Sequence, residues 1–178
     1  PEFKHIEVGE DKFAVEASVS IPVRTRERTI ADAIESALMQ KTDFPFNVII
    51  IDNCSTDRTT EIIKERYGNN PQVIHMIVGD IGVGACWNLA AHHEQAGKFC
   101  VQLDSDDVYE DENTLTTMAN AFYEQNCAMV VGSYTLTDIN RNILPPGLVD
   151  HREWTPENGR NNALRINGLG APRAFYTP

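Results

Sequence analysis

Apolar positions along the chain repeat with two periods, one typical of strands and one typical of amphipathic helices. The stretch 46–52 (FNVIIID) is a continuous apolar run of strand length, as expected for a strand covered on both faces. The stretch 27–40 instead places Ile30, Ile34 and Leu38 at helical spacing, which indicates one buried face. The predicted strands are 14–23, 46–52, 72–78, 98–104 and 127–138. The predicted helices are 27–40, 57–68, 82–97 and 112–126.

The order of these elements indicates the fold class. Four β-then-α units at roughly even spacing favour a mostly parallel sheet with helices on both faces. We therefore expect one α/β domain, an α/β/α sandwich, with a leader at 1–13 and a core at 14–140. No internal repeat is evident.

Polar clusters directly follow four of the predicted strands. In parallel sheets, ligands bind beyond the carboxyl ends of the strands. The clusters at 22–26, 52–55, 79–84 and 104–107 come from separate stretches of the chain. The predicted fold brings all of them to one edge of the sheet, so we expect the chemistry there.

Composition narrows the class of partner. The chain has 178 residues, 42% hydrophobic content and a formal net charge of −11. This charge argues against a non-specific nucleic-acid surface but permits a small anionic ligand held through a cation. No apolar stretch approaches the roughly 20 residues of a transmembrane helix. The cysteines lack C-x-x-C spacing, which favours buried, reduced thiols and a cytoplasmic location. They are Cys54, Cys86, Cys100 and Cys127.

Three carboxylates lie close together in VQLDSDDVY (101–109), at Asp104, Asp106 and Asp107. One interpretation is a solvated turn whose acids favour the N-terminus of the following helix. The other is a divalent cation site, because D-x-D at a strand end can hold Mg²⁺ or Mn²⁺ together with water and diphosphate oxygens. The glycine and glutamate of an EF-hand loop are missing. These residues alone leave both interpretations open.

The other strand-end clusters are individually weak signals. Asp52 could accept hydrogen bonds from a nucleobase or ribose, or form an Asx-turn, whereas Ser55 or Asp57 fits a helix cap. Arg24 could meet a phosphate or lie in solvent. The stretch GDIGVGACWN (79–88) echoes the dinucleotide fingerprint, but a bulky tryptophan stands where helix packing needs glycine. We therefore exclude a dinucleotide site of the Rossmann type.

Taken in order, these segments resemble the family 2 glycosyltransferases of the GT-A fold. The resemblance is carried by SVSIPVRTRERTIADAIESALMQ, VIIIDNCSTDRTTEIIKE, GVGACWNLA and VQLDSDDVY, across about residues 18–140. The segment 167–178 (NGLGAPRAFYTP) is a looser match to the part that precedes the acceptor side of the site. The chain departs from the family pattern at PVRTR (22–26), at Asn53 and at Cys86-Trp87-Asn88, which leaves the identity of the nucleotide open.

The resemblance implies a role for each matching position. The end of the first strand would flank the nucleobase, the pair after the second would hold uracil and ribose, and the glycine loop would close over the base. Residues after the fourth strand would meet the ribose, the diphosphate and a Mn²⁺ or Mg²⁺ ion. The implied nucleotide-binding residues are Pro22, Val23, Arg24, Asp52, Asn53, Gly82, Gly84, Asp104 and Ser105. The implied metal ligands are Asp106 and Asp104, and Asp107 stays unassigned.

The implied activity is inverting transfer of a sugar from a nucleotide-diphospho-sugar, such as a UDP-sugar, to a saccharide or lipid-linked acceptor. It would occur in the cytoplasm, including the cytoplasmic face of a membrane. The general base of this family is expected beyond Pro178, and neither Glu153 nor Glu157 lies in the matching motif. We therefore expect 141–178 to be the incomplete start of the acceptor-side region, and this fragment to transfer sugar poorly.

Two other functions are compatible with part of the pattern. A sugar nucleotidyltransferase also uses paired acids and Mg²⁺, but it typically has a glycine-rich phosphate loop after the first strand, where this chain has no glycine. A non-catalytic domain that binds nucleotide or saccharide is the other alternative.

Overall fold

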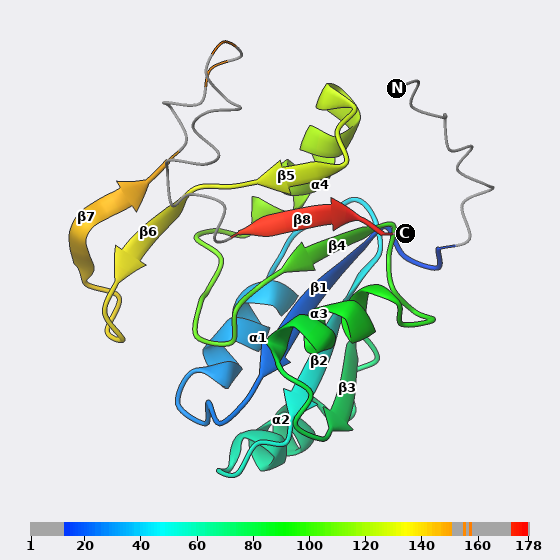
Figure 1. Cartoon of the computed structure of the whole chain (residues 1–178), viewed down its shortest axis with the longest axis vertical. Coiled ribbons are helices and arrows are strands. Elements are labelled where there is room, and N and C mark those ends of the chain that lie inside the picture. The colour runs from blue at the N-terminus through cyan, green and yellow to red at the C-terminus, as the bar shows by residue number, and fades with distance from the viewer. Residues whose placement is uncertain (1–12, 151–154, 156, 158–171, 178) are drawn as a thin grey trace.

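Six strands form the main sheet, in the order β3-β2-β1-β4-β8-β5 (Figure 1). The computed structural model describes residues 13–150, 155, 157 and 172–177. The strands of the main sheet are β1 (Ala17–Val23), β2 (Phe46–Asn53), β3 (Val73–Val78), β4 (Phe99–Gln102), β5 (Met129–Val131) and β8 (Arg173–Tyr176). The helices are α1 (Ile30–Leu38), α2 (Thr59–Tyr67), α3 (Val83–Ala91) and α4 (Thr114–Gln125).

The sheet is mostly parallel, as the alternation of strands and helices predicts. Strands β3, β2, β1 and β4 run parallel to their neighbours, whereas β8 is antiparallel to both β4 and β5. The parallel strands therefore have their carboxyl ends at one edge, and β8 begins at that same edge. The expected α/β/α sandwich with a mostly parallel central sheet is confirmed.

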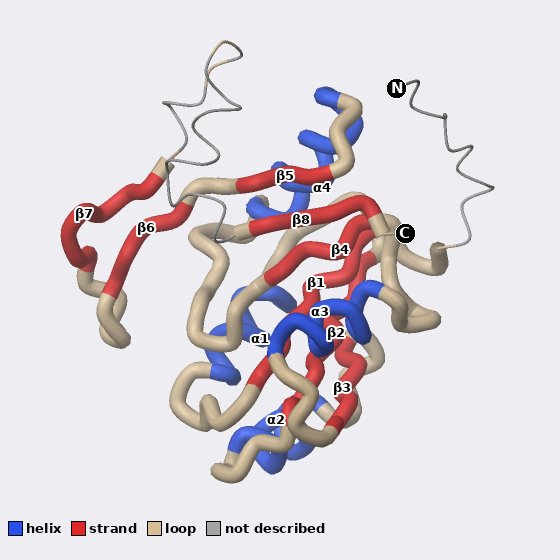
Figure 2. Tube along the Cα trace, viewed as in Figure 1, coloured by secondary structure: helices blue, strands red, loops and turns tan. Residues whose placement is uncertain are grey.

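Successive side chains of each strand point to opposite faces, and this alternation divides the core in two. On one face, residues such as Val19 and Val48 pack with the buried stripes of α1, α2 and α4. On the other face, Ile49 and Ile51 pack with Cys86 of α3. Figure 2 shows α3 on one side of the sheet and α1 and α2 on the other. The face that α3 covers is the one that bears the candidate site.

The strand predicted at 127–138 is wrong as a single element. It breaks at Gly132, where the backbone N–H donates to the Pro172 carbonyl oxygen at 2.9 Å. A side chain at Gly132 would lie only 2.7 Å from the Pro172 ring, so this close approach needs glycine. The first half becomes β5 in the main sheet. The second half, β6 (Tyr134–Thr137), pairs with β7 (Ile143–Val149) in a separate two-stranded sheet.

The helix predicted at 82–97 is also too long. It ends at Ala91: His92 N–H still donates to the Asn88 carbonyl oxygen at 3.0 Å, but the His92 backbone leaves the helical conformation and His93 N–H donates to the Ala90 carbonyl oxygen at 3.3 Å, which closes the last turn. Gly97 then lies against the backbone of Ala17, where a Cβ atom would come within 2.6 Å. The glycine thus marks a close crossing of β1 rather than the end of the helix.

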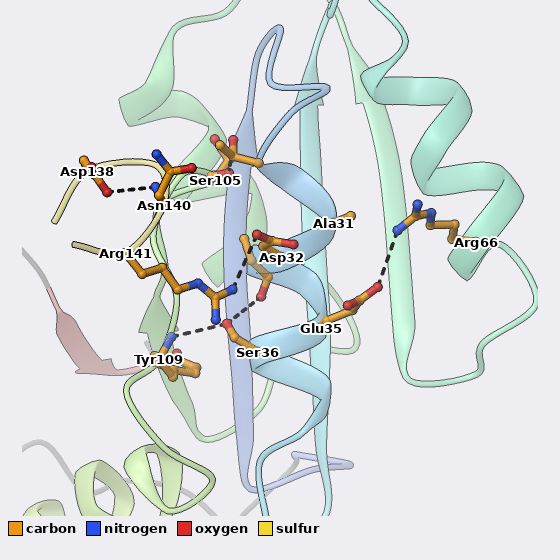
Figure 3. A network of polar contacts seen from close by, with 12 residues as sticks. Ala31, Asp32, Glu35, Ser36, Arg66, Ser105, Tyr109, Asp138, Asn140 and Arg141 are labelled. Carbon is orange, nitrogen blue, oxygen red and sulfur yellow. Dashed lines mark hydrogen bonds and ion pairs between the residues drawn. The ribbon is translucent and has the colours of Figure 1, made fainter.

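The tip of the β6–β7 hairpin folds back towards α1. Arg141 Nη2 lies 3.4 Å from Asp32 Oδ2 of that helix, as Figure 3 shows. Both side chains are exposed, so this ion pair contributes little to stability. Among the helices of the described residues, none has both the length and the apolar character that crossing a bilayer requires.

Candidate functional site

A cavity of about 210 Å³ opens at the carboxyl edge of the parallel strands. It lies between the ends of β1, β2 and β4 and the first turn of α3. Its lining combines cations, carboxylates and one amide with small apolar groups, a mixture suited to a polar, anionic ligand. The lining residues are Pro22, Val23, Arg24, Arg26, Asn53, Val83, Cys86, Asp104, Ser105 and Asp106.

Most of the residues that the resemblance implicated share this cavity. Those that line it are Pro22, Val23, Arg24, Asn53, Asp104, Ser105 and Asp106. Asp52, Gly82 and Gly84 are absent from the lining. The structure adds Arg26, Val83 and Cys86, which the predicted set lacked. Arg26 lies within the first polar cluster, and Val83 lies between the two predicted glycines. Their nearness in the sequence to predicted site residues could therefore have indicated that they belong to the site.

Asp52 and Asn53 point to opposite faces of β2, because neighbouring strand residues alternate. Asn53 reaches the cavity on the α3 side. Asp52 is fully buried on the α2 side, where it accepts a 3.0 Å hydrogen bond from Ser55 N and another from the Thr60 hydroxyl. Burial alone would raise the pKa of Asp52, but these hydrogen bonds outweigh it and hold the pKa below its ordinary value. In this geometry the Asp52 side chain holds the loop between β2 and α2, and its assignment to the nucleotide stays a prediction.

Asn53 also fixes the loop that leads into α3. Its Oδ1 accepts a 3.0 Å hydrogen bond from Ile81 N, which holds the loop against the end of β2. Gly82 then adopts a positive φ of 78° and precedes the first residue of α3. This left-handed conformation favours glycine. The glycine therefore shapes the loop, while Val83 supplies the side chain that lines the cavity.

The loop that carries the acids is anchored to α1. Asp107 N donates to the Asp104 carbonyl oxygen at 3.0 Å, which closes a turn. Thr29 Oγ1 donates to the Ser105 carbonyl oxygen at 3.0 Å. Further along, Tyr109 N donates to Ser36 Oγ at 3.2 Å (Figure 3). These bonds fix the backbone of the loop at the edge of the sheet and hold its carboxylates near one another.

The three carboxylates of this loop repel one another. Desolvation raises the pKa of Asp104, and the neighbouring Asp106 raises it further. Desolvation, followed by the charges of Asp104 and Asp106, raises the pKa of Asp107 to about 6. Arg26 Nε lies 3.4 Å from Asp106 Oδ2 and offsets part of this negative charge. A local field of this sign favours binding of a cation.

The donor set fits a hard divalent ion that shares its coordination with a ligand. Within the described residues, no group of three or more His, Cys, Asp or Glu side chains surrounds a common point. A closed protein cage, such as a structural zinc site, is therefore not a match for this part of the chain. One or two carboxylates with water and phosphate oxygens are typical of Mg²⁺ sites, and Asp104 and Asp106 line the cavity together.

Comparison with known proteins identifies the family of this chain. The profile of glycosyl transferase family 2 matches residues 18–175. Chondroitin synthase of Pasteurella multocida is 34% identical over 130 residues, which cover 73% of this chain and 13% of that protein. The poly(ribitol-phosphate) beta-N-acetylglucosaminyltransferase TarS of Staphylococcus aureus is 35% identical over 165 residues, which cover 90% of this chain and 27% of that protein.

Solved structures share the fold. A crystal structure of Staphylococcus aureus TarS 1-349 superposes with a TM-score of 0.66 at 22% identity, over 91% of this chain and 47% of that one. A mannosyltransferase from Pyrobaculum calidifontis, in complex with GDP-Man and Mn²⁺, gives a TM-score of 0.60 at 18% identity, over 96% of this chain and 47% of that one.

The fold and the cavity define an α/β domain with a polar site at the carboxyl edge of its sheet. The chain belongs to glycosyl transferase family 2. It spans about an eighth to a quarter of the length of the curated relatives described above.

Proposed function

We propose that the chain is the donor-binding domain of an inverting, metal-dependent glycosyltransferase. The donor would be a nucleotide-diphospho-sugar, most simply a UDP-sugar, and the acceptor a saccharide or a lipid-linked glycan. One observation carries the proposal. A single cavity collects, from three separate segments, seven of the residues that the resemblance assigned to nucleotide and metal. They are Pro22, Val23, Arg24, Asn53, Asp104, Ser105 and Asp106.

In this proposal the nucleoside lies over β1 and β2. Asn53 presents an amide to the edge of the base or to the ribose, because an amide can both donate and accept. Arg24 Nη1 lies 2.7 Å from Asp80 Oδ1, so this ion pair holds the guanidinium beside the loop that leads into α3. Pro22 and Val23 supply the apolar surface under the nucleoside.

The diphosphate then lies over the end of β4. Asp106 and Asp104 would hold Mn²⁺ or Mg²⁺, which supplies positive charge to the departing diphosphate. Arg26 lies beside Asp106 and adds a second cation at the same place. We assign no described residue the role of general base. The hydrogen bonds from Thr29 and Tyr109 keep the loop in place before the ligand arrives, which limits the ordering that binding requires.

The choice of UDP rests on likeness. A structure of Staphylococcus aureus TarS is described in complex with UDP-GlcNAc, and it superposes on this chain with a TM-score of 0.64. The relatives described above are a chondroitin synthase and a poly(ribitol-phosphate) beta-N-acetylglucosaminyltransferase, which favours a polymeric acceptor. The described cysteines are free, in keeping with the cytoplasmic location that we propose.

Calorimetric titration with UDP, GDP and CDP, each with and without Mn²⁺, tests the proposal. We expect UDP to bind, and to bind more tightly with Mn²⁺. In Asp106→Asn the gain from Mn²⁺ should vanish while thermal unfolding stays unchanged, because the Asp106 carboxylate is half exposed. Asp43→Asn, at an exposed position outside the cavity lining, is the matched control and should bind as wild type does. If no nucleoside diphosphate binds in a metal-dependent way, the donor-site proposal fails.

A further inference from the structure

Arg173 stands at the start of β8, beside the acids of the site. Because β8 runs antiparallel to β4, its first residue lies at the carboxyl edge where the parallel strands end. Arg173 is the cross-strand partner of Gln102, which precedes Asp104 by two residues. Paired residues share a face, and Gln102 faces the side of the sheet that α3 covers. Arg173 therefore points to the same side as the cavity.

The order of the strands along the edge determines the order in which the parts of the donor would lie over them. Along the edge, Asn53 ends β2, Pro22 lies near the end of β1, Asp104 follows β4, and Arg173 begins β8. Neighbouring strands lie about 4.8 Å apart. If the nucleoside lies over β2 and β1 and the diphosphate over β4, the donor's sugar comes next, over β8. This step rests on the function proposed above.

Arg173 also differs from the other arginines of the edge in its contacts. Arg24 forms an ion pair with Asp80 at 2.7 Å, and Arg26 lies 3.4 Å from Asp106. Among the described residues, Arg173 forms no ion pair, and its buried Nε has no hydrogen-bond partner. Its charge is nevertheless near enough to Asp104 to oppose the rise in that carboxyl's pKa. Arg173 does not line the cavity itself, but it is a cation near Asp104 whose buried Nε has no hydrogen-bond partner among the described residues.

Unused guanidinium donors in a partly buried place suit a ligand rich in oxygen acceptors. A guanidinium presents several N–H groups in a rigid plane and has no acceptor of its own. The Gln102 side-chain oxygen beside it is likewise buried without a hydrogen-bond partner among the described residues. A donor and an acceptor side by side match the hydroxyl groups of a sugar, since each hydroxyl both donates and accepts. A phosphate, which only accepts, would leave the Gln102 oxygen unpaired.

We propose that Arg173 binds the transferred sugar of the donor, with Gln102 as its neighbour in the same subsite. Arg173 then determines how much affinity the sugar adds to that of the nucleoside diphosphate. The Asp104 and Asp106 end of the site binds the diphosphate whether or not a sugar is attached. The two parts of the donor are therefore separable by comparing UDP with UDP-sugars.

The experiment measures affinities for UDP and for a panel of UDP-sugars in the presence of Mn²⁺. The panel holds UDP-glucose, UDP-N-acetylglucosamine, UDP-N-acetylgalactosamine and UDP-glucuronate. Wild type should bind at least one of them more tightly than UDP. In Arg173→Gln that gain should fall by about tenfold, the value of one strong hydrogen bond, while the affinity for UDP stays within about twofold. Arg173→Lys should keep part of the gain, because lysine retains the charge but not the planar fork.

Controls separate this role from a structural one. Arg66→Gln removes an exposed arginine that pairs with Glu35 on the other face of the sheet, and it should leave all affinities unchanged. Thermal unfolding of each variant shows whether β8 still joins the sheet, and Arg173→Lys is the informative variant if Arg173→Gln unfolds. An equal loss for UDP and UDP-sugars would make Arg173 a phosphate ligand and overturn the inference.

Two further results would also overturn it. One is unchanged affinities in Arg173→Gln and Arg173→Lys, and the other is a wild type that gains nothing from any sugar of the panel. Failure of wild type to bind UDP with Mn²⁺ is a different result, because it refutes the proposed function and this inference with it.

Discussion

Replacing Asp52 by alanine should destabilise the fold far more than it weakens nucleotide binding. The Asp52 carboxylate is fully buried and accepts hydrogen bonds from Ser55 N and the Thr60 hydroxyl, with His75 Nε2 at 3.6 Å. Each hydrogen bond to a buried charge contributes about 1.5–3 kcal/mol. Two of them give a loss of roughly 3–6 kcal/mol, against a total stability of roughly 5–15 kcal/mol for a domain. For a chain of this length, Tm should fall by about 10 °C.

The assay pairs Asp52→Ala with Asn53→Ala, since these neighbours point to opposite faces of β2. Urea unfolding followed by circular dichroism gives the stability of both variants. Calorimetry at a temperature where both are folded gives the affinity for UDP with Mn²⁺. We expect Asp52→Ala to lose stability and keep most of its affinity, and Asn53→Ala to lose more affinity than Asp52→Ala does. The reasoning is refuted if Asp52→Ala unfolds like wild type but no longer binds the nucleotide.

Three other changes test the packing that holds the site. Gly97→Ala should lower the free energy of unfolding in urea by about 2 kcal/mol, because the new Cβ would lie 2.6 Å from the backbone of Ala17. Gly84→Ala is the matched control: a Cβ there meets nothing within 4 Å, so the change should leave the stability unchanged or raise it by up to about 1 kcal/mol through the helix propensity of alanine in α3. Gln40→Leu should cost about 2–4 kcal/mol, because the Gln40 amide accepts from the Leu115 N–H and donates to the Asp111 carbonyl oxygen; an unchanged urea midpoint would contradict this. Burial lowers the pKa of His75, although Asp52 opposes the shift. Because the unfolded chain then binds a proton more readily than the folded one, stability should fall as pH drops below about 6.5. His75→Gln should flatten this dependence in urea midpoints measured from pH 7.5 to 5.5.

The parallel half of the fold was predictable because its signals are local. The stretch 46–52 holds four consecutive β-branched apolar residues at 48–51, and a strand with that pattern must be covered on both faces. It became β2, whose eight residues are all buried. The helical spacing of 27–40 likewise marks the face of α1 that packs on the sheet, with Ile30 and Ile34 fully buried. Periodicity of this kind shows which side of an element is buried, so it predicts both the type of the element and the face that packs against the next layer.

The antiparallel half was not predictable in the same way. Strand β8 has four residues, of which only Ala174 is fully buried. It joins the sheet because β4 and β5 offer edges on either side of it, and that pairing links residues far apart in the chain. The break at Gly132 depends on its contact with Pro172, which is another long-range event. Short segments that acquire their structure from distant partners leave no period in the sequence.

The site was predictable in its location but not in the direction of its side chains. The rule that ligands bind at the carboxyl ends of parallel strands brought four polar clusters together, and seven of the implicated residues do line one cavity. The rule does not say towards which face of the sheet each side chain points. Strand alternation, applied to 46–53, would have placed Asp52 with Val48 and Ile50 towards α2, and Asn53 with Ile51 towards α3. The same reasoning places Arg173 beside Gln102 on the α3 side, once β8 is known to pair with β4. The faces of the strands therefore limit which polar residues of the edge can meet a single ligand, since Asp52 lies on the α2 side of the sheet whereas Asn53 and Arg173 lie on the α3 side.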